Sequence, residues 1–411
     1  MGANYIPEKT AIGPLSADLC EHMVGLGHSV TLITGFPHYP EWRVYDKYRG
    51  KMFEREELHG VNVLRGFIYV PPKPTPIHRI AYDSSIAASA SVNLLRCGTP
   101  DVIVVVSPPL QLAVVALVAG KLWRVPVLLS IQDIVPDVAI QLGILKSRTL
   151  VSLARWLEHL CYRHATHIAV ICDGFIDNLV GKSVPLNKLS VIHNWVDTDV
   201  IRPLNRLNGF RDKHGIGPEI FLVLYAGNMG AKQGLDAIIY TAKQLQDQPN
   251  MRFILVGDGV AMQGLSQMAQ QRKLPNLSFL PFETEEMLPE MLAAADVLFI
   301  SQSRFVSSEV LPAKLSKYMA AGRPVVAAVS SESETASHIR KSRGGIVVRP
   351  DRPSEIARTL RNLLQNNCLG EELGANGRRY VEGNMAREGM LKRYAGLIES
   401  LARTGSRVGA R

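Results

Sequence analysis

Short apolar runs rich in β-branched residues alternate with helix-period segments along most of this 411-residue chain. The apolar runs predict strands at 30–34, 61–67, 102–106, 126–131, 168–171, 189–192, 221–226, 252–256, 277–280, 297–300, 324–328 and 345–348. Helical periodicity lies between them, for example at 15–26, 110–123, 150–162, 235–245 and 356–364. Continuous apolar strands separated by helices predict an α/β protein whose parallel sheets are buried on both faces.

The pattern restarts after a polar stretch with proline and glycine, 203–217, which is typical of an interdomain linker. We therefore expect two similar α/β units, 1–203 and 204–384. Ligands of open parallel sheets lie outside the carboxyl ends of the strands, so both units can offer loops to a cleft between them. The last helix, from about 385 to 402, has an apolar stripe that needs a partner.

The start of the chain leaves little room for the first strand of a doubly wound domain. That strand should precede the loop at Tyr5, and only residues 1–4 are available for it. Either the first strand is very short, or the native chain begins upstream of Met1.

Composition is that of a globular protein with a sizeable core, because 46% of residues are hydrophobic and 20% are charged. No apolar run reaches the roughly 20 residues that a membrane-spanning helix needs. The five cysteines form no CxxC pair and no metal-ligand spacing. We therefore expect reduced thiols in a soluble, cytoplasmic protein without a metal site.

Positive charge is concentrated at the end of the sequence. The whole chain has a net charge of +9, and residues 340–411 alone contribute +8. Such a segment suits anionic partners such as phospholipid headgroups or a diphosphate-linked lipid. A solvated helical surface with clustered arginines is an equally good interpretation. Nucleic acid is not expected, because no recognised binding motif and no aromatic interleaving are present.

A glycine-rich segment, 227–234 (GNMGAKQG), follows a predicted strand and opens a predicted helix. Gly227 and Gly230 would let backbone N–H groups approach a ligand, and the helix start adds positive potential for an anion. Lys232 supplies a charge for a diphosphate. A plain strand-to-helix turn with a surface lysine explains the spacing equally well.

A second candidate is the segment 307–314 (SSEVLPAK), which leads into another helix. Pro312 suits the first turn of that helix. Glu309 would stand just before the turn, where its carboxylate could accept sugar or ribose hydroxyls, and Lys314 would face the same cleft. An acid favoured by the helix dipole is the simpler reading of Glu309.

Two loops of the first unit complete the candidates. Residues 5–14 enter the first helix near Gly13 and could bring a helix start to the phosphates. Asp133, at the carboxyl end of a predicted strand, is placed for a polar role or for a helix cap.

Other motifs resemble dinucleotide-binding or metal-binding sites, but their sequence context does not support those sites. The glycines of 25–27 follow a helix, and 257–259 lacks the third glycine of a dinucleotide fingerprint, so a nicotinamide enzyme is disfavoured. Asp197 and Asp199 resemble a metal-binding pair but are better explained as a turn. The eleven histidines form no metal-binding array.

Taken in order, these segments resemble glycosyltransferase family 4, and within it the colanic-acid-type exopolysaccharide transferases and amino-fucosyl transferases. The matching pieces cover nearly the whole chain: YIPE…IG at 5–13, GHSV at 27–30, FPHYP at 36–40, QDIVP at 132–136, VIHNWVD at 191–197, GNMGAKQG at 227–234, VGDG at 256–259, ADV at 295–297, LPAK at 311–314 and AAGRPVV at 320–326. Each piece is weak alone, and the ordered set is specific.

The resemblance implies a GT-B fold of two Rossmann-like domains facing a central cleft, with the helix of 385–411 crossing back to the first domain. It also implies that the second domain binds the nucleotide-sugar donor and the first binds the acceptor. Transfer with retention at the anomeric carbon and no essential metal or other cofactor follow from it too. An acceptor carried on a membrane lipid, as in exopolysaccharide or O-antigen biosynthesis, places the enzyme in the cytoplasm or on the inner face of the cell membrane.

Mapped onto this sequence, the resemblance makes Lys232, Lys314 and Asp133 the candidate catalytic residues. It assigns donor binding to a wider set of residues: Gly13, Gly227, Asn228, Gly230, Glu309, Val310 and Leu311. The sequence departs from the family pattern at Asn228, usually arginine, at Lys317, usually the second glutamate of a Glu-x7-Glu motif, and at Gln132, often histidine.

Two other functions fit the same features. A GT-B nucleotide-sugar epimerase would use the same donor site without an acceptor. A non-catalytic nucleotide-sugar-binding protein is suggested by Lys317 in place of the second glutamate. Both UDP-sugars and GDP-sugars fit these motifs as the donor.

Overall fold

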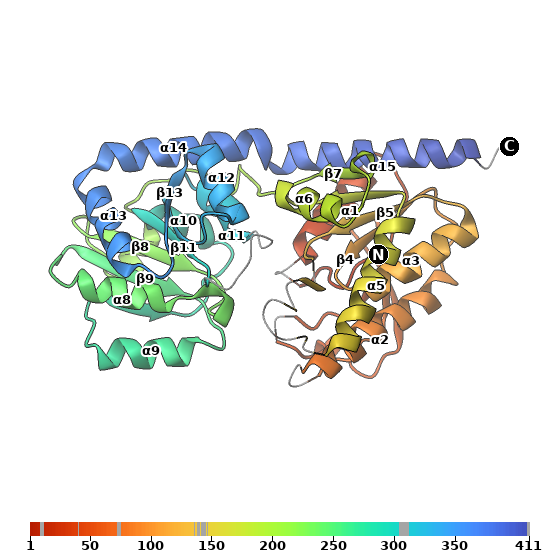
Figure 1. Cartoon of the computed structure of the whole chain (residues 1–411), viewed down its shortest axis with the longest axis horizontal. Helices are drawn as coiled ribbons and strands as arrows, with labels where there is room; N and C mark the ends of the chain where they lie inside the picture. The colour runs from red at the N-terminus through yellow and green to blue at the C-terminus, as the bar shows by residue number, and fades with distance from the viewer. Residues whose placement is uncertain are drawn as a thin grey trace. The chain divides into compact units, whose positions relative to one another are not determined.

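A computed structural model describes residues 1–8, 12–39, 41–71, 75–134, 136–137, 140, 145, 147–303 and 312–408. The chain forms two compact units (Figure 1). Unit 1 consists of Met1–Asn194 and Met390–Arg411, and unit 2 of Trp195–Gly389. Among the described helices, none is both long and apolar enough to cross a membrane.

Unit 1 contains two sheets, ordered β1-β3-β2 and β4-β5-β6-β7. All pairs are parallel except β2–β3. The strands are β1 (Thr31–Gly35), β2 (Phe53–Leu58), β3 (Val61–Gly66), β4 (Ile103–Ser107), β5 (Val127–Ile131), β6 (His167–Val170) and β7 (Leu189–Val191). The helices of this unit are α1 (Gly13–Gly25), α2 (Pro76–Leu94), α3 (Leu110–Trp123), α5 (Arg148–His164) and α6 (Asp173–Gly181), with 3-10 turns η1 (Asp46–Tyr48) and η2 (Leu186–Lys188).

The first residues of the chain connect these two sheets. The Gly2 N–H donates to Ile33 O of β1, and the Val106 N–H of β4 donates to Met1 O. Residues 1–4 therefore lie between β1 and β4, where the first strand of a doubly wound domain is expected.

Unit 2 is built around one parallel sheet, ordered β10-β9-β8-β11-β12-β13. Its strands are β8 (Phe221–Ala226), β9 (Met251–Val256), β10 (Leu277–Leu280), β11 (Val297–Ser301), β12 (Val325–Ala328) and β13 (Gly345–Val348). Two buried apolar clusters include alternate residues of the same strands, so the sheet is covered on both faces. The structure is the predicted α/β class.

The helices of unit 2 follow the strands in the order expected for crossover connections. They are α7 (Gly209–Lys213), α8 (Asp236–Gln244), α9 (Met262–Gln271), α10 (Leu288–Ala294), α11 (Lys314–Ala320), α12 (Glu334–Ser342), α13 (Pro353–Gln365) and α14 (Asn367–Asn384), with a 3-10 turn η3 (Ala231–Gln233).

The boundary between the units differs from the predicted one at 203. The chain enters unit 2 at Trp195, because Val196 and Ile201 are already part of its buried core. The predicted linker 203–217 is also partly a packed element. In it α7 buries Arg211, whose guanidinium donates to Asp296 Oδ2 at 2.7 Å. Because this helix is held by a buried ion pair, its sequence lacks the apolar periodicity that predicts a packed helix.

The final helix, α15 (Arg387–Val408, blue in Figure 1), begins in unit 2 and continues in unit 1. Its stripe of apolar residues is buried at Met390, Leu391, Tyr394 and Ile398. The Tyr394 hydroxyl is 2.8 Å from the Ser130 hydroxyl at the end of β5. The apolar stripe is therefore covered by unit 1, as expected. The part of the helix that belongs to unit 1 begins at Met390, five residues later than the predicted start at 385.

Candidate active site

Two neighbouring strands of unit 2 end in glycines that lie in close contact. Gly227 follows β8 with φ of 140°, and Gly257 follows β9 with φ of 142°. The Gly227 N–H donates to Val256 O at 2.9 Å. A Cβ on Gly257 would overlap the Gly227 carbonyl oxygen. Glycine is required here because both the left-handed φ and the backbone contact exclude a side chain.

Lys314 is held against this glycine pair by its own helix. Tyr318, one turn along α11, donates its hydroxyl to Ala226 O at 3.1 Å and accepts the Ala226 N–H at 2.7 Å. These bonds pin α11 to the end of β8. The Lys314 Nζ lies 3.7 Å from the centre of the Tyr225 ring. A Cβ built on Gly227 would lie 2.7 Å from the same Nζ.

The Lys314 ammonium has no hydrogen-bond partner within the described parts of the chain, although its Nζ is buried. Burial lowers the pKa of Lys314 to about 7. A buried cation without an acceptor is unfavourable unless a counter-charge binds beside it. This corner of unit 2 can therefore bind an anionic group that approaches the glycine turn.

Lys232 lies at the same edge of the sheet but is exposed. Its carbonyl oxygen accepts the Ser303 N–H at 2.8 Å, so the glycine-rich segment is attached to the end of β11. Asn228 is also exposed, and its carbonyl oxygen accepts the Tyr225 hydroxyl at 2.6 Å. The structure thus brings Gly227 and Lys314 together and places Lys232 and Asn228 on loops of the same edge.

The helix predicted at 235–245 is present as α8, and Gly230 precedes a separate short turn rather than the start of that helix. Residues Ala231–Gln233 form the short turn η3, and α8 begins only at Asp236. Gly234, with φ of 55°, interrupts the path between them, and the Gly230 N–H is used by Gln233 Oε1 at 3.0 Å. Gly230 therefore does not offer a free helix amide. Glu309, Val310 and Leu311 lie outside the described residues.

In unit 1, Gly13 is the buried first residue of α1. A Cβ there would be 3.0 Å from Glu8 O, so the tight entry into the helix favours glycine. Asp133 is exposed, two residues beyond β5. Its neighbour Gln132 accepts the Asn194 amide at 2.8 Å and donates to Ser130 Oγ at 3.3 Å.

Sequence reasoning missed a buried polar cluster at the carboxyl ends of the unit 1 strands. The Glu8 carboxylate accepts the N–H groups of His38 and Tyr39, both at 2.8 Å, and the Asn4 amide at 3.0 Å. His38 is buried and lies between Phe36 O and the Tyr82 hydroxyl, each 2.9 Å from a ring nitrogen. Burial lowers the pKa of His38, and the Glu8 carboxylate opposes that shift. Both residues belong to segments that carried the family resemblance, but a single sequence could not show that they meet.

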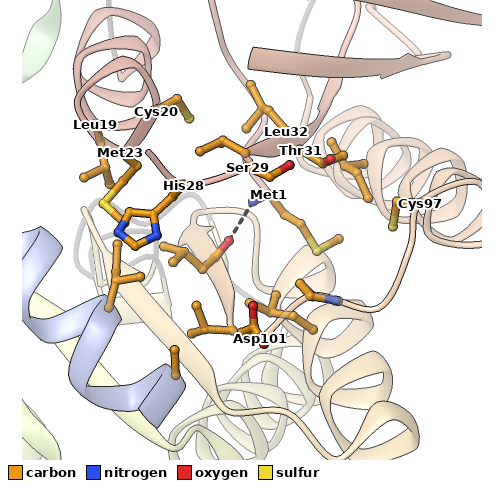
Figure 2. Close-up of a pocket in the computed structure, with 18 of the residues that line it drawn as sticks. Met1, Leu19, Cys20, Met23, His28, Ser29, Thr31, Leu32, Cys97 and Asp101 are labelled. Carbon is orange, nitrogen blue, oxygen red and sulfur yellow. Dashed lines mark hydrogen bonds between the residues drawn. The ribbon is translucent and has the colours of Figure 1, made fainter. Parts of the chain in front are cut away.

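An apolar cavity of about 490 Å³ lies elsewhere in unit 1 (Figure 2). It is lined by residues that precede β1 and β4, including Ser29 and Asp101, and by Cys20 and Met23 of α1. The Met1 ammonium donates to Val104 O at 2.6 Å beside it. Because these residues lie at the amino ends of the strands, the cavity is at the opposite edge from Glu8 and Asp133.

No group of three or more histidine, cysteine or carboxylate side chains with metal-binding geometry occurs in the described residues.

Comparison with known proteins gives the same division of the chain. Residues 10–195 match the family model described as "Glycosyl transferase 4-like domain", and residues 208–380 match "Glycosyl transferases group 1". The chain is 29% identical to WcaI of Escherichia coli K12, over 96% of this chain and 97% of that protein; the name of WcaI places it in colanic acid biosynthesis as a glycosyl transferase.

Solved structures share the fold at low identity. Sucrose-phosphate synthase of Thermosynechococcus elongatus superposes with a TM-score of 0.75 and 14% identity, over 96% of this chain and 94% of that one. Anabaena HepE in complex with UDP gives a TM-score of 0.71 and 15% identity, over 97% and 99%. With both family models matched in order, the chain belongs to the GT-B glycosyltransferases, with a glycosyl transferase 4-like domain followed by a group 1 domain.

Proposed function

We propose that this enzyme transfers a sugar from a nucleotide-sugar, with UDP or GDP as the nucleotide, onto a lipid-linked saccharide in exopolysaccharide or O-antigen biosynthesis. The name of WcaI supports a role in polysaccharide synthesis, and WaaG, a structural neighbour with 17% identity, is described as acting in lipopolysaccharide biosynthesis. HepE has been solved with UDP and with UDP-glucose, which supports a uridine nucleotide as the first donor to test.

The observation that carries this proposal is the ammonium of Lys314, which is buried beside Gly227 without a hydrogen-bond partner among the described residues. A diphosphate placed against the glycine turn would supply the counter-charge and let the lysine hold its proton at neutral pH. Glycine at this point leaves room for the phosphate to approach the backbone.

In the proposed reaction the bond between the anomeric carbon and the diphosphate oxygen breaks, and a bond from that carbon to the acceptor oxygen forms on the same face. The acceptor's proton passes to the departing diphosphate, so no separate base is required. Lys314 and Lys232 stabilise the negative charge that develops on the leaving group, which is commonly the largest catalytic contribution. No metal ion is needed in this scheme.

The remaining predicted residues have supporting roles in the proposal. Glu309, Val310 and Leu311 would contact the donor, with the Glu309 carboxylate accepting sugar hydroxyls. In unit 1, Asp133 would orient the acceptor hydroxyl, and Gly13 would let the start of α1 approach the phosphates. Because the acceptor is carried on a lipid, the enzyme would work at the inner face of the cell membrane.

A transfer assay tests the proposal. Purified protein is incubated with radiolabelled UDP-glucose, UDP-galactose, GDP-mannose or GDP-fucose and with a lipid extract that contains undecaprenyl-diphosphate saccharides. We expect label to enter the lipid fraction with one donor, and the Lys314→Met variant to lose that transfer. Donor conversion without acceptor would instead indicate an epimerase. Donor binding without any product would indicate a non-catalytic binding protein.

A further inference from the structure

One helix of unit 1 exposes large apolar side chains in a row. On α5, labelled in Figure 1, Leu153 is 57% exposed and Trp156 is 59% exposed. They are three residues apart and therefore lie on the same side of the helix. The opposite side is buried in the unit through Cys161 and Tyr162. An exposed tryptophan next to an exposed leucine is unfavourable in water unless the surface is covered in use.

The exposed surface of α5 is also strongly cationic: Arg163, seven residues after Trp156, lies on the same stripe, and Arg148 and Arg155 lie on its flank away from Leu153. Arg148, Arg155 and Arg163 are exposed, and none of them has an acidic partner in the parts of the chain that the structure describes. The only acid of the helix, Glu158, is buried and accepts from the Tyr162 hydroxyl at 2.9 Å and from Lys182 at 2.8 Å. The exposed face of α5 therefore combines apolar area with unneutralised positive charge.

The neighbouring helix α3 packs beside α5 and carries exposed residues of the same two kinds. Val118 and Leu122 are exposed and apolar, and Lys121 and Arg124 are exposed and basic. No acidic residue occurs between Leu110 and Arg124. The mixed apolar and basic character thus continues from one helix to the next.

The basic carboxy-terminal segment is a weaker candidate for a docking surface. Much of its charge is used inside the fold. Arg361 pairs with Asp247 at 3.0 Å, and Arg378 donates to the Ile201, Thr198 and Ala320 carbonyls. On α15, Arg393 donates to Val191 O and Arg403 pairs with Glu399. The net charge of that segment therefore overstates the charge available to a partner.

We propose that the exposed face of α5, formed by Arg148, Leu153, Arg155, Trp156 and Arg163, docks on an anionic membrane. Tryptophan is favoured at the boundary between headgroups and acyl chains, where its ring is buried and its N–H stays hydrated. Arginines on the flanks of the same face pair with anionic headgroups. The inference rests on the proposed lipid-linked acceptor for its purpose, because an enzyme held at the bilayer meets such acceptors in two dimensions.

Sedimentation with vesicles tests this assignment without donor or acceptor. The full chain is mixed with vesicles of phosphatidylglycerol and phosphatidylethanolamine, and the bound fraction is measured against lipid concentration. We expect Trp156→Ala to lower the partition coefficient roughly tenfold, the scale of burying one large apolar side chain. Arg155→Glu with Arg163→Glu should lower it about 25-fold or more, because each basic residue near the surface contributes about fivefold and each new carboxylate is repelled.

Two matched variants serve as controls. Phe282→Ala removes an apolar residue of unit 2 that is 60% exposed, close to the value for Trp156, and Arg403→Glu reverses a charge on α15. Both should bind vesicles like wild type. The assignment is overturned if wild type does not bind anionic vesicles, if the α5 variants bind normally, or if Arg403→Glu has the larger effect.

The outcome can be separated from that of the proposed function. The α5 variants should keep wild-type transfer to an acceptor dissolved in detergent and lose transfer to the same acceptor in vesicles. Loss of transfer in detergent as well would show that α5 acts on the reaction itself and would contradict a docking role. Absence of transfer by wild type under both conditions would refute the proposed function and leave the vesicle binding to be judged alone.

Discussion

Glu8 in unit 1 and Lys314 in unit 2 both bury a charged group at the carboxyl edge of a sheet, and they differ in their hydrogen-bond partners among the described residues. In unit 1, both oxygens of Glu8 accept hydrogen bonds, from the His38 and Tyr39 amides and from Asn4. In unit 2, the Lys314 ammonium lies over an aromatic ring without a hydrogen-bond acceptor among the described residues. The carboxylate thus holds two loops together, whereas the ammonium is available for an anion.

This difference indicates that Glu8 supports the fold, whereas Lys314 serves ligand binding. A buried charge with all its partners stabilises the conformation that supplies them, and removing it leaves those partners unsatisfied. A buried charge without partners costs stability, so its removal is neutral or stabilising for the fold and harmful to ligand binding. Substitutions at the two sites should therefore have opposite effects on stability and activity.

The largest expected effect is that of Lys314→Met on turnover. Because the variant keeps the length of the side chain and loses its charge, we expect kcat to fall on the order of 10²- to 10³-fold with the best donor. The melting temperature should stay level or rise, because the change removes a buried cation that has no hydrogen-bond acceptor in the part of the chain that the structure describes. Steady-state transfer rates and thermal denaturation measure the two effects. A lower melting temperature with normal turnover would contradict the assignment.

Lys232→Ala sharpens the contrast within unit 2. We expect a fall in turnover on the order of 10²-fold, as for the loss of one charge-stabilising donor. Stability should change by less than about 0.5 kcal/mol, because Lys232 is exposed and its structural bond is made by the backbone. Near-wild-type turnover in the same transfer assay would rule out a role for this side chain on the diphosphate.

Glu8→Ala tests the architectural side of the comparison. The change leaves the His38 and Tyr39 N–H groups buried without an acceptor, which should lower the free energy of unfolding by about 2–3 kcal/mol. Urea denaturation gives that value directly. Calorimetric donor affinity should fall far less than with Lys314→Met, since the donor is assigned mainly to unit 2. A loss of donor affinity with unchanged stability would reverse the roles given to the two units.

The smallest expected effect, counted for a change of one pH unit, is on donor affinity. With a pKa of about 7 in the free protein, Lys314 is largely neutral at pH 9 and must take up a proton when it binds a diphosphate. Affinity for UDP-glucose should therefore fall up to about tenfold per pH unit between pH 7 and 9. The unliganded protein should gain stability over the same range, because the unfolded state binds the extra proton.

The Lys314→Arg variant is the control for the fall of UDP-glucose affinity between pH 7 and 9. Arginine keeps its proton throughout this range, so its binding isotherms at pH 7 and 9 should agree. An equal slope in wild type and in this variant would assign the pH dependence to another group.

Much of the fold was predictable because the pattern of apolar residues along the chain indicates its strands and helices. All twelve predicted strands are present, and α3 has the predicted limits. The strand that was missed, β2, is polar (FEREEL) and pairs antiparallel at the edge of its sheet, where one side faces solvent. The helix α7 was missed because a buried ion pair, Arg211 with Asp296, holds it in place.

The site was predictable only in part. Motif order brought Lys314 and Gly227 into one hypothesis, and the structure places them side by side. The short turn η3 and the left-handed Gly234 that follows it depend on backbone geometry that composition does not reveal. The partnership of Glu8 with His38 joins two loops that are thirty residues apart in the sequence. The catalytic roles given to Lys232, Lys314 and Asp133 are still predictions.

Thermal shift with a nucleotide panel tests the central claim most directly. Wild type and Lys314→Met are melted with UDP, GDP, ADP and their common sugar conjugates, each at about one hundred times its Kd where binding is detected. The account predicts that one nucleotide class stabilises wild type by about 2.7 kcal/mol, seen as a rise of several degrees, and has little effect on the variant. An equal shift in both proteins, or no shift with any nucleotide, would contradict a donor site at Lys314.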